Sequence, residues 1–352
     1  MSQSHWSTRS LILPFLISCP FLAGAIAIYT HPFETFDSTL VMDDIEYATY
    51  QRENDREDKT HSLTLDLYQP KQPQSGPLPV IMYIHGGGWE ENAKRDCPGE
   101  LISSYGYAVI CPTHRYSYEA TFPAQIHDIK AAVRWVRAKA YIHDFNPNKI
   151  GVIGEASGGH LSALLGTSNG IEELEGQQGH SEFSSDVQAV VSWSGPTDFA
   201  QIPIAFEGDP TPKEYKQLQD LPWAHLTRIT TKLLGGPISE NPEKVDLANP
   251  INFISPDDPP FLVVHDESDR WIPISQSEIL VEALESWEVE VDFQRETVRH
   301  QQIVSKADII NNAVLGETMS FFYRHLKADY EQETSDSSDY LQSYEQMKET
   351  AN

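Results

Sequence analysis

Residues 85–89 read HGGGW and follow directly on the apolar run 80–84. Consecutive glycines leave the backbone N–H groups of Gly87 and Gly88 unobstructed by side chains. In a loop that follows a buried strand, such groups can stabilise the negative charge that develops on a carbonyl oxygen under attack. A flexible glycine turn is the alternative interpretation. The position directly after an apolar run favours an oxyanion loop.

A second glycine-rich segment, GEASGGHL, lies between a strand-like apolar run and a helical pattern. This order is typical of a nucleophile elbow, in which the residues two before and two after the nucleophile must be small. Gly154 and Gly158 therefore place Ala156, which has no nucleophilic atom, at the tip of the turn. Centring the turn on Ser157 would put the bulky Glu155 where the strand and helix backbones meet. The sequence thus predicts Ala156 at the tip and Ser157 one step into the helix.

An acidic segment and a histidine follow, in the chain order of a nucleophile, an acid and a base. Residues 265–273 read HDESDRWIP, directly after the apolar run 261–264, and Asp269 is the candidate acid. A carboxylate there can orient an imidazole and stabilise its charged form. His300, which follows the last predicted strand, is the candidate base. A solvated acidic loop is the alternative, and the order of the motifs favours the catalytic interpretation.

Apolar runs alternate with helical patterns through the middle of the chain. Continuous runs, typical of strands covered on both faces, lie at 80–84, 107–111, 150–153, 187–193 and 261–264, while 63–67 and 289–293 alternate. A helical stripe lies within residues 126–136. This alternation predicts an α/β fold with a mostly parallel, doubly wound sheet. Residues 200–258, rich in Pro, Asp and Gly, predict a small inserted cap lobe over the carboxyl edge of the sheet, where ligands bind.

The two ends of the chain differ from the middle. An uncharged apolar segment at 11–28 predicts a signal peptide, residues 1–27, cleaved after Ala27. An uncleaved N-terminal membrane anchor is the alternative. A lipoprotein signal is a third interpretation, because residues 16–19 resemble a lipoprotein cleavage box that ends at Cys19. Residues 28–60 are expected to be a polar lead-in with one short strand at most, and residues 327–352 a disordered acidic tail. We therefore expect a protein that is exported, periplasmic or extracellular, or else anchored to a membrane.

Export would place the folded part of the chain in an oxidising compartment. Cys97 and Cys111 are then candidates for a disulfide. Two separate thiols, with Cys111 buried in a strand, are the alternative.

The charge of the chain excludes several classes of partner. Lys and Arg number 25 against 52 Asp and Glu, a formal charge of −27, so nucleic acid is not an expected partner. Contact with a membrane is expected only through an uncleaved N-terminal segment. No Cys/His spacing resembles a zinc site, and no P-loop or dinucleotide fingerprint is present. We expect no metal, no cofactor and a small-molecule substrate that is not strongly anionic.

Over about residues 60–326, the chain resembles the α/β-hydrolase superfamily, and within it bacterial feruloyl-esterase-like and hormone-sensitive-lipase-like carboxylesterases. The resemblance is carried by HGGGW, the helix at 124–138, GEASGGHLSALLGTSNG at 154–170, GPTDF at 195–199 and residues 233–278. It implies an α/β-hydrolase domain over 61–326 and a Ser-His-Asp type hydrolysis of short-chain or aromatic acyl esters. It also implies Asp269 as the triad acid, His300 as the base, and the N–H groups of Gly87, Gly88 and Ser157 as the oxyanion hole.

The chain departs from the family pattern at the nucleophile and the base. The family's elbow reads G-x-S-x-G-G-H-L, and Ala156 stands where its serine would be. His300 lies between Arg299 and Gln301 rather than in a G-H-G-like turn, and Asp266 replaces a usual glycine. Three explanations of the elbow remain open. In the first, Ser157 acts as the nucleophile through a shifted turn. In the second, the protein is a pseudo-hydrolase that serves as a ligand binder or scaffold, and in the third, Ala156 replaces the serine of a parent enzyme.

Overall fold

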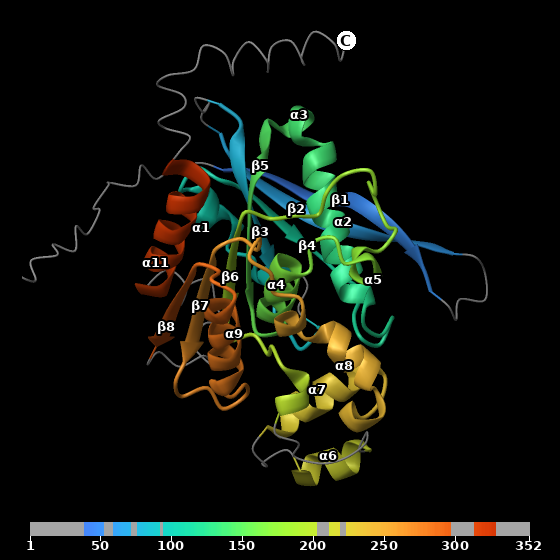
Figure 1. Ribbon diagram of the computed structural model, residues 1–352. Helices are drawn as coiled ribbons and strands as arrows, with labels where there is room; N and C mark the ends of the chain where they lie inside the picture. The colour runs from blue at the N-terminus through green and yellow to red at the C-terminus, as the bar shows by residue number, and fades with distance from the viewer. Residues whose placement is uncertain are drawn as a thin grey trace, which may run out of the picture. The chain divides into compact units, whose positions relative to one another are not determined.

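The apolar runs of the sequence form the strands of one sheet. The computed structural model describes residues 39–52, 59–71, 76–91, 94–202, 211–218, 223–296 and 313–328. Its eight strands lie in the order β1-β2-β4-β3-β5-β6-β7-β8 (Figure 1). They are β1 (Thr39–Gln51), β2 (Thr60–Pro70), β3 (Leu78–Ile84), β4 (Ala108–Pro112), β5 (Phe145–Glu155), β6 (Ala189–Trp193), β7 (Phe261–Asp266) and β8 (Val291–Glu296). Neighbouring strands are parallel from β4 to β8, and the β1–β2 and β2–β4 pairs are antiparallel. The prediction of a mostly parallel sheet is confirmed.

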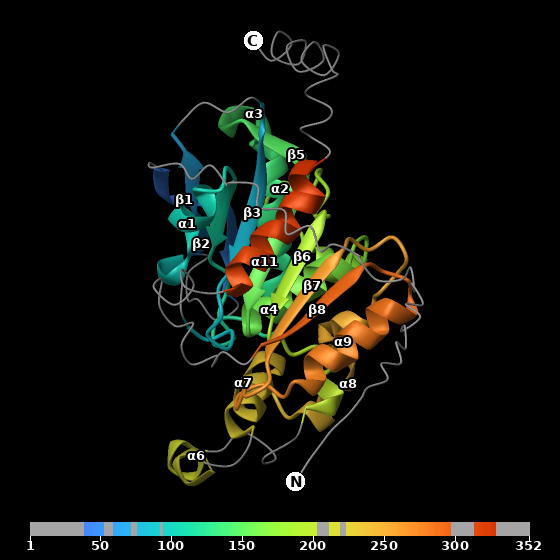
Figure 2. The same ribbon diagram turned by 90° about the vertical axis from the view of Figure 1, so that its left-hand side faces the viewer.

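Helices cover both faces of this sheet. On one face lie α2 (Ala124–Ala138), α4 (Ser157–Thr167) and α9 (Ser275–Ser286), and on the other α1 (Gly99–Ser103) and α11 (Ala313–Phe322). Figure 2 shows the sheet from the face on which α11 lies. All seven residues of β3 are buried, because helices on both faces exclude water from the central strands. Further short segments are η1 (Lys94–Asp96), α3 (Ala140–His143) and α5 (Glu172–Glu175).

The chain between β6 and β7 forms a helical lobe whose described helices lie between residues 199 and 252. It contains η2 (Phe199–Gln201), α6 (Pro212–Leu218), α7 (Ala224–Leu234), η3 (Ile238–Glu240), α8 (Pro242–Ala248) and η4 (Pro250–Asn252). Figures 1 and 2 show α6, α7 and α8 beyond one end of the central strands. That end is the carboxyl edge, because Ile229 of α7 lies against Gly88, just after β3. The lobe therefore covers the edge at which the sequence places the chemically active loops.

The segment before β2 contains more structure than the sequence suggested. The expectation of one short strand at most in residues 28–60 was wrong, since β1 alone has 13 residues. It pairs antiparallel with β2, from Thr39 opposite Pro70 to Gln51 opposite Thr60. The strand is polar and acidic because it lies at the edge of the sheet, where charged side chains are common. Its backbone pairing depends on β2, which the composition of β1 does not reveal.

A disulfide joins Cys97 to Cys111, so of the two cysteine alternatives the structure has the bonded one. The Cα atoms are 6.3 Å apart, within the range that a disulfide spans. Cys111 lies in β4 and Cys97 just before α1. The bond therefore ties α1 to the sheet.

The last described segment extends past the boundary expected for the folded domain. Helix α11 continues into a π-helical segment, η6 (Tyr323–Lys327). Lys327 donates from Nζ to the Tyr105 carbonyl (2.8 Å) and lies 4.2 Å from the ring centroid of Tyr107. Lys327 thus belongs to the fold, and the expected start of the tail at 327 was too early. The remainder of the expected tail, residues 329–352, lies outside the described residues, as do the N-terminal segment 1–27 and His300.

No helix in the described parts of the chain is long and apolar enough to cross a membrane.

Candidate active site

Ala156 occupies the tip of the turn between β5 and α4. Its backbone has φ 51° and ψ −114°, a conformation that residues with a Cβ rarely adopt. Strand β5 ends at Glu155 and α4 begins at Ser157. The Ala156 N–H donates to the carbonyl of Trp193 at the end of β6 (2.8 Å). The strand, strained turn and helix follow one another as the sequence predicts, with Ala156 at the tip.

The flanking glycines show why the turn is centred on residue 156. A Cβ on Gly154 would lie 2.3 Å from the backbone of Gly158, and a Cβ on Gly158 would lie 2.1 Å from the carbonyl oxygen of Ile84 in β3. Both obstacles are backbone atoms, which cannot rotate aside as the end of a side chain can. Glycine is therefore required at both positions, and the residue midway between them is Ala156.

Ser157 is the first residue of α4, and its side chain is enclosed by protein. The residue is 2% exposed, and Oγ has no hydrogen-bond partner among the described residues. Its backbone N–H lies in the first turn of the helix, where amides have no intrahelical acceptor and carry partial positive charge. The amide of Ser157 is thus suited to stabilise an anion, whereas its hydroxyl is buried.

The loop after β3 lies directly against the elbow. A Cβ on Gly86 would be 3.8 Å from the Cβ of Ala156. Gly87 and Gly88 have φ values of 102° and 64°, which glycine adopts without strain. The Gly87 carbonyl accepts the N–H of Glu90 (3.1 Å). Because the C=O and N–H of one trans peptide point in opposite directions, the Gly88 N–H points away from this internal turn.

Trp89 and His160 join the oxyanion loop to the elbow helix, a role that the sequence analysis did not identify. The buried Trp89 ring meets the rings of His160 and Phe199 edge-on, at centroid distances of 5.3 and 5.9 Å. His160 donates through Nε2 to the carbonyl of Ala248 in α8 (2.7 Å). Burial lowers the pKa of His160 to about 4, so its imidazole is neutral at pH 7. His160 therefore connects α4, the loop after β3 and the lobe.

Helix α7 is fixed to the oxyanion loop by charge and by packing. Glu90 accepts two hydrogen bonds from Arg228 (2.6 and 3.2 Å) and one from Lys232 (2.7 Å). Burial alone would raise the pKa of Glu90, but the two cations lower it below its usual value. The Ile229 side chain lies 3.1 Å from the position that a Cβ on Gly88 would take. Sequence patterns gave no signal for the contact between Arg228 and Glu90, which are 138 positions apart.

Asp269 lies in the loop after β7, with its side chain buried. Its Oδ1 accepts the backbone N–H groups of Trp271 (2.7 Å) and Ile272 (3.0 Å). These bonds fix the orientation of the carboxylate. The elbow follows β5 and this loop follows β7, with only β6 between them. Asp269 and Ala156 therefore lie at the same edge of the sheet.

His265 lies near Asp269 but is held by other groups. Its Nε2 is 3.9 Å from Asp269 Oδ2 and donates to the carbonyl of Ile272 (3.1 Å). With Nε2 protonated, Nδ1 accepts from the hydroxyl of Ser277 (2.7 Å). Both ring nitrogens are thus engaged in holding the loop, which is a structural role.

The candidate base, His300, lies outside the described residues. Strand β8 ends at Glu296, which is opposite Asp266 of β7, and the N–H of Glu267 donates to the Glu296 carbonyl (2.8 Å). The described chain therefore leaves the sheet beside the Asp269 loop, four residues before His300.

Comparison with known proteins relates the chain to esterases. The BD-FAE family model matches residues 65–284. The chain is 30% identical over 245 residues to the probable carboxylic ester hydrolase LipM of Mycobacterium tuberculosis, a match over 68% of this chain and 51% of LipM. Esterase LipC of the same organism is 28% identical over 223 residues, covering 62% of this chain and 51% of LipC. The chain thus spans about half the length of these two relatives.

Solved structures give the same relationship. The chain is 31% identical to the bifunctional GH43-CE protein of Bacteroides eggerthii, with a TM-score of 0.65 over 81% of this chain and 38% of that one. A truncated carbohydrate esterase from gut microbiota is 28% identical, with a TM-score of 0.63 over 83% of this chain and 97% of that one.

Proposed function

The chain belongs to the BD-FAE family and has the α/β-hydrolase fold, and on this basis we propose that it hydrolyses carboxylic esters at the turn around Ala156. The observation that carries the proposal is the strained backbone of Ala156, which sets the start of α4 against the glycine loop after β3. Relatives that are named esterases or ester hydrolases support it.

The proposed site uses backbone amides to bind the ester. The carbonyl oxygen is placed between the N–H groups of Gly87, Gly88 and Ser157, which stabilise the negative charge of a tetrahedral intermediate. Asp269 orients His300, whose imidazole takes and returns the proton. The buried side chain of Asp269 and its two backbone hydrogen bonds support this assignment.

In this proposal Ser157 supplies the attacking oxygen. Its Oγ bonds to the ester carbonyl carbon while the hydroxyl proton passes to His300, and collapse of the intermediate expels the alcohol, which takes that proton. Water then attacks the acyl-serine, and the acid is released. The turn in the structure is centred on Ala156 and the Oγ of Ser157 is buried. The step therefore requires the turn to re-centre on Ser157, a backbone displacement of about 3.8 Å.

We further propose that the substrate is a neutral ester with a short-chain or aromatic acyl group. The formal charge of −27 repels anionic molecules as they approach, which favours neutral ones.

One specific observation favours a second candidate function, that of a ligand binder with impaired turnover. Ala156 lies at the tip of the turn, and the Oγ of Ser157 is buried. A site of this kind retains the oxyanion amides and binds an ester without forming an acyl-serine.

Hydrolysis of p-nitrophenyl acetate separates the two functions. The native chain is compared with Ser157→Ala and Ala156→Ser, and Ser103→Ala serves as the control because the Oγ of Ser103 is also buried and lies on the other face of the sheet. Loss of activity with Ser157→Ala alone supports Ser157 as the nucleophile. Activity that appears only with Ala156→Ser contradicts Ser157 and supports the ligand binder.

We also propose that the protein is exported or anchored through its N-terminal segment. The apolar residues 11–28 and the disulfide between Cys97 and Cys111 support this location. Fractionation of cells that express the full chain, with mass spectrometry of its N-terminus, tests it. Recovery of the intact chain from the cytoplasm alone would refute it.

A further inference from the structure

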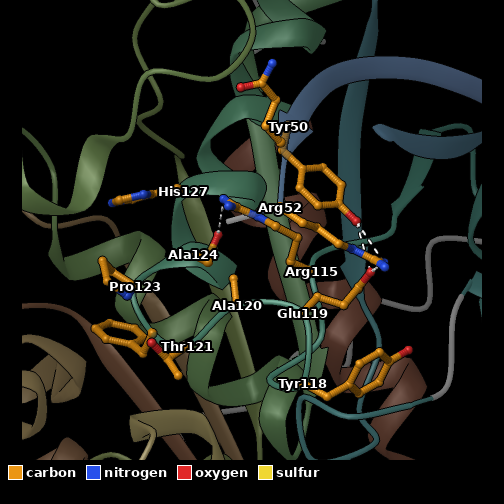
Figure 3. Close-up of a pocket in the computed structure, with 12 residues that line it drawn as sticks. Tyr50, Arg52, Arg115, Tyr118, Glu119, Ala120, Thr121, Pro123, Ala124 and His127 are labelled. Atoms are coloured by element: carbon orange, nitrogen blue, oxygen red, sulfur yellow. Dashed lines mark hydrogen bonds and ion pairs between the residues drawn. The ribbon is translucent and has the colours of Figure 1, made fainter. Parts of the chain in front are cut away.

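A pocket lined by no residue of the elbow or of the glycine loop lies between the end of β1, the segment after β4 and the start of α2. Its volume is about 550 Å³, within the range of small-molecule sites. Polar and aromatic side chains line it, including those of Tyr50, Arg52, Arg115, Tyr118, Glu119 and His127 (Figure 3). None of these residues has a role in the proposed hydrolysis.

The charges of this pocket are balanced in pairs. Arg115 forms a two-pronged ion pair with the buried Asp128, Nη2 to Oδ1 at 2.7 Å and Nε to Oδ2 at 2.9 Å. Arg52 forms an ion pair with Glu119. Because each guanidinium has its own carboxylate, the walls present no net charge that would select an anion or a cation. The acidity of the whole chain further disfavours anions.

The polar groups of the wall are held in place by one another. The Tyr50 hydroxyl donates to Glu119 Oε1 (3.0 Å) and accepts from Arg52 Nη2 (3.4 Å), and Figure 3 shows these three side chains converging. Arg115 also lies 5.2 Å from the Tyr50 ring centroid. Arg52 Nε is buried with no hydrogen-bond partner in the described parts of the chain. The wall thus offers fixed donors and acceptors side by side.

An aromatic ring stands at the side of the pocket. Tyr118 is 71% exposed, and its ring centroid lies 5.4 Å from that of Tyr116. Its neighbour Ser117 is anchored by an N–H donated to the carbonyl of Trp89 (2.7 Å). Tyr118 is therefore a flat apolar surface on a positioned backbone.

We propose that this pocket binds a neutral sugar unit of a carbohydrate. A pyranose or furanose ring has C–H groups that pack on an aromatic face, and its hydroxyls both donate and accept hydrogen bonds. The exposed ring of Tyr118, the paired charges and the adjacent donors and acceptors match these three properties. The inference does not depend on the proposed hydrolysis, because it concerns equilibrium binding at residues outside the elbow.

Isothermal titration calorimetry on the full chain tests this proposal with xylohexaose, cellohexaose and mannohexaose as neutral probes and trigalacturonate as an anionic one. We expect saturable binding of at least one neutral probe, weakened about two- to tenfold by Tyr118→Ala, since an aromatic contact of this kind contributes that much. Glu119→Gln, which unbalances the charge pairs, weakens binding as well.

Phe183→Ala is the matched control, because Phe183 is an exposed aromatic residue outside the pocket. It leaves binding unchanged, and circular dichroism confirms that the variants are folded. Three results would overturn the proposal: no binding of any neutral probe, equal binding by Tyr118→Ala and the native chain, or tighter binding of trigalacturonate than of the neutral probes.

Discussion

Arg228 of helix α7 donates two hydrogen bonds, of 2.6 and 3.2 Å, to the carboxylate of Glu90. Glu90 lies two residues after Gly88 of the glycine loop. This pair joins the inserted lobe to the loop that carries the proposed oxyanion donors. Both side chains are largely shielded from solvent, so the pair is screened less than a surface ion pair.

Replacing Arg228 should therefore loosen the lobe. We expect Arg228→Ala to lower the free energy of unfolding by about 1.5–3 kcal/mol, the usual contribution of hydrogen bonds to charged groups. Arg324→Ala is the control, because its partner Asp292 is about half exposed and such pairs contribute about 1 kcal/mol or less. Urea denaturation measures both, and equal losses would contradict the assigned role of Glu90.

The elbow should not tolerate a methyl group at residue 158. A Cβ there meets the carbonyl oxygen of Ile84 at 2.1 Å, so we expect Gly158→Ala to destabilise the fold by at least about 2 kcal/mol. Gly316→Ala, in helix α11 with nothing within 4 Å of the added atom, should be neutral or stabilising by about 0.5–1 kcal/mol. Thermal melts compare the two, and a tolerated Gly158→Ala would refute the observed packing of the elbow.

Asp269 should matter for turnover more than for folding. Asp269→Asn keeps an oxygen for the amides of Trp271 and Ile272 but loses the charge that stabilises an imidazolium. The change is made in the native chain or in Ala156→Ser, whichever hydrolyses the ester faster. We expect Asp269→Asn to lower kcat by up to about 10⁴-fold. Asp266→Asn is the control, because Asp266 Oδ1 accepts from Ser268 in the same loop. Equal effects on kcat would argue against Asp269 as the acid.

The stability of the fold should fall in mild acid, partly through His160. Burial lowers the pKa of His160 from 6.5 to about 4. Between these values the unfolded state binds a proton that the folded state does not, so stability is lost as pH falls from about 6.5 to about 4. His160→Gln should reduce the pH dependence of the free energy of unfolding in this range by the contribution of about one proton. Urea melts from pH 7 to pH 4 measure this dependence, and an unchanged dependence in His160→Gln refutes the prediction.

The disulfide should stabilise the fold by restricting the unfolded chain. Cys97 and Cys111 are 14 residues apart, and closing a loop of this length contributes about 3 kcal/mol. We expect the double variant Cys97→Ala, Cys111→Ala to melt at a lower temperature than the native chain and to be insensitive to reductant. The native chain should lose the same stability when reduced.

The arrangement of the elbow could be predicted because it depends on a local steric requirement, that of small residues two before and two after the tip. Glycines at 154 and 158 leave residue 156 as the tip whatever the rest of the chain does, and the structure has Ala156 there. The central strands were also predictable, since a strand covered on both faces reads as a continuous apolar run. Strand β1 was underestimated because its pairing lies in β2 rather than in its own residues.

By itself, then, the sequence determined the central parallel strands, the order of the motifs and the residue at the tip of the elbow. All of these follow from steric and apolar patterns within short segments. The tertiary structure decided four other features: the burial of Ser157 Oγ, the ion pair of Arg228 with Glu90, the hydrogen bond from His160 to Ala248, and the pocket beside Tyr118. These features depend on contacts between residues far apart in the chain, and such contacts have no local signature in the sequence.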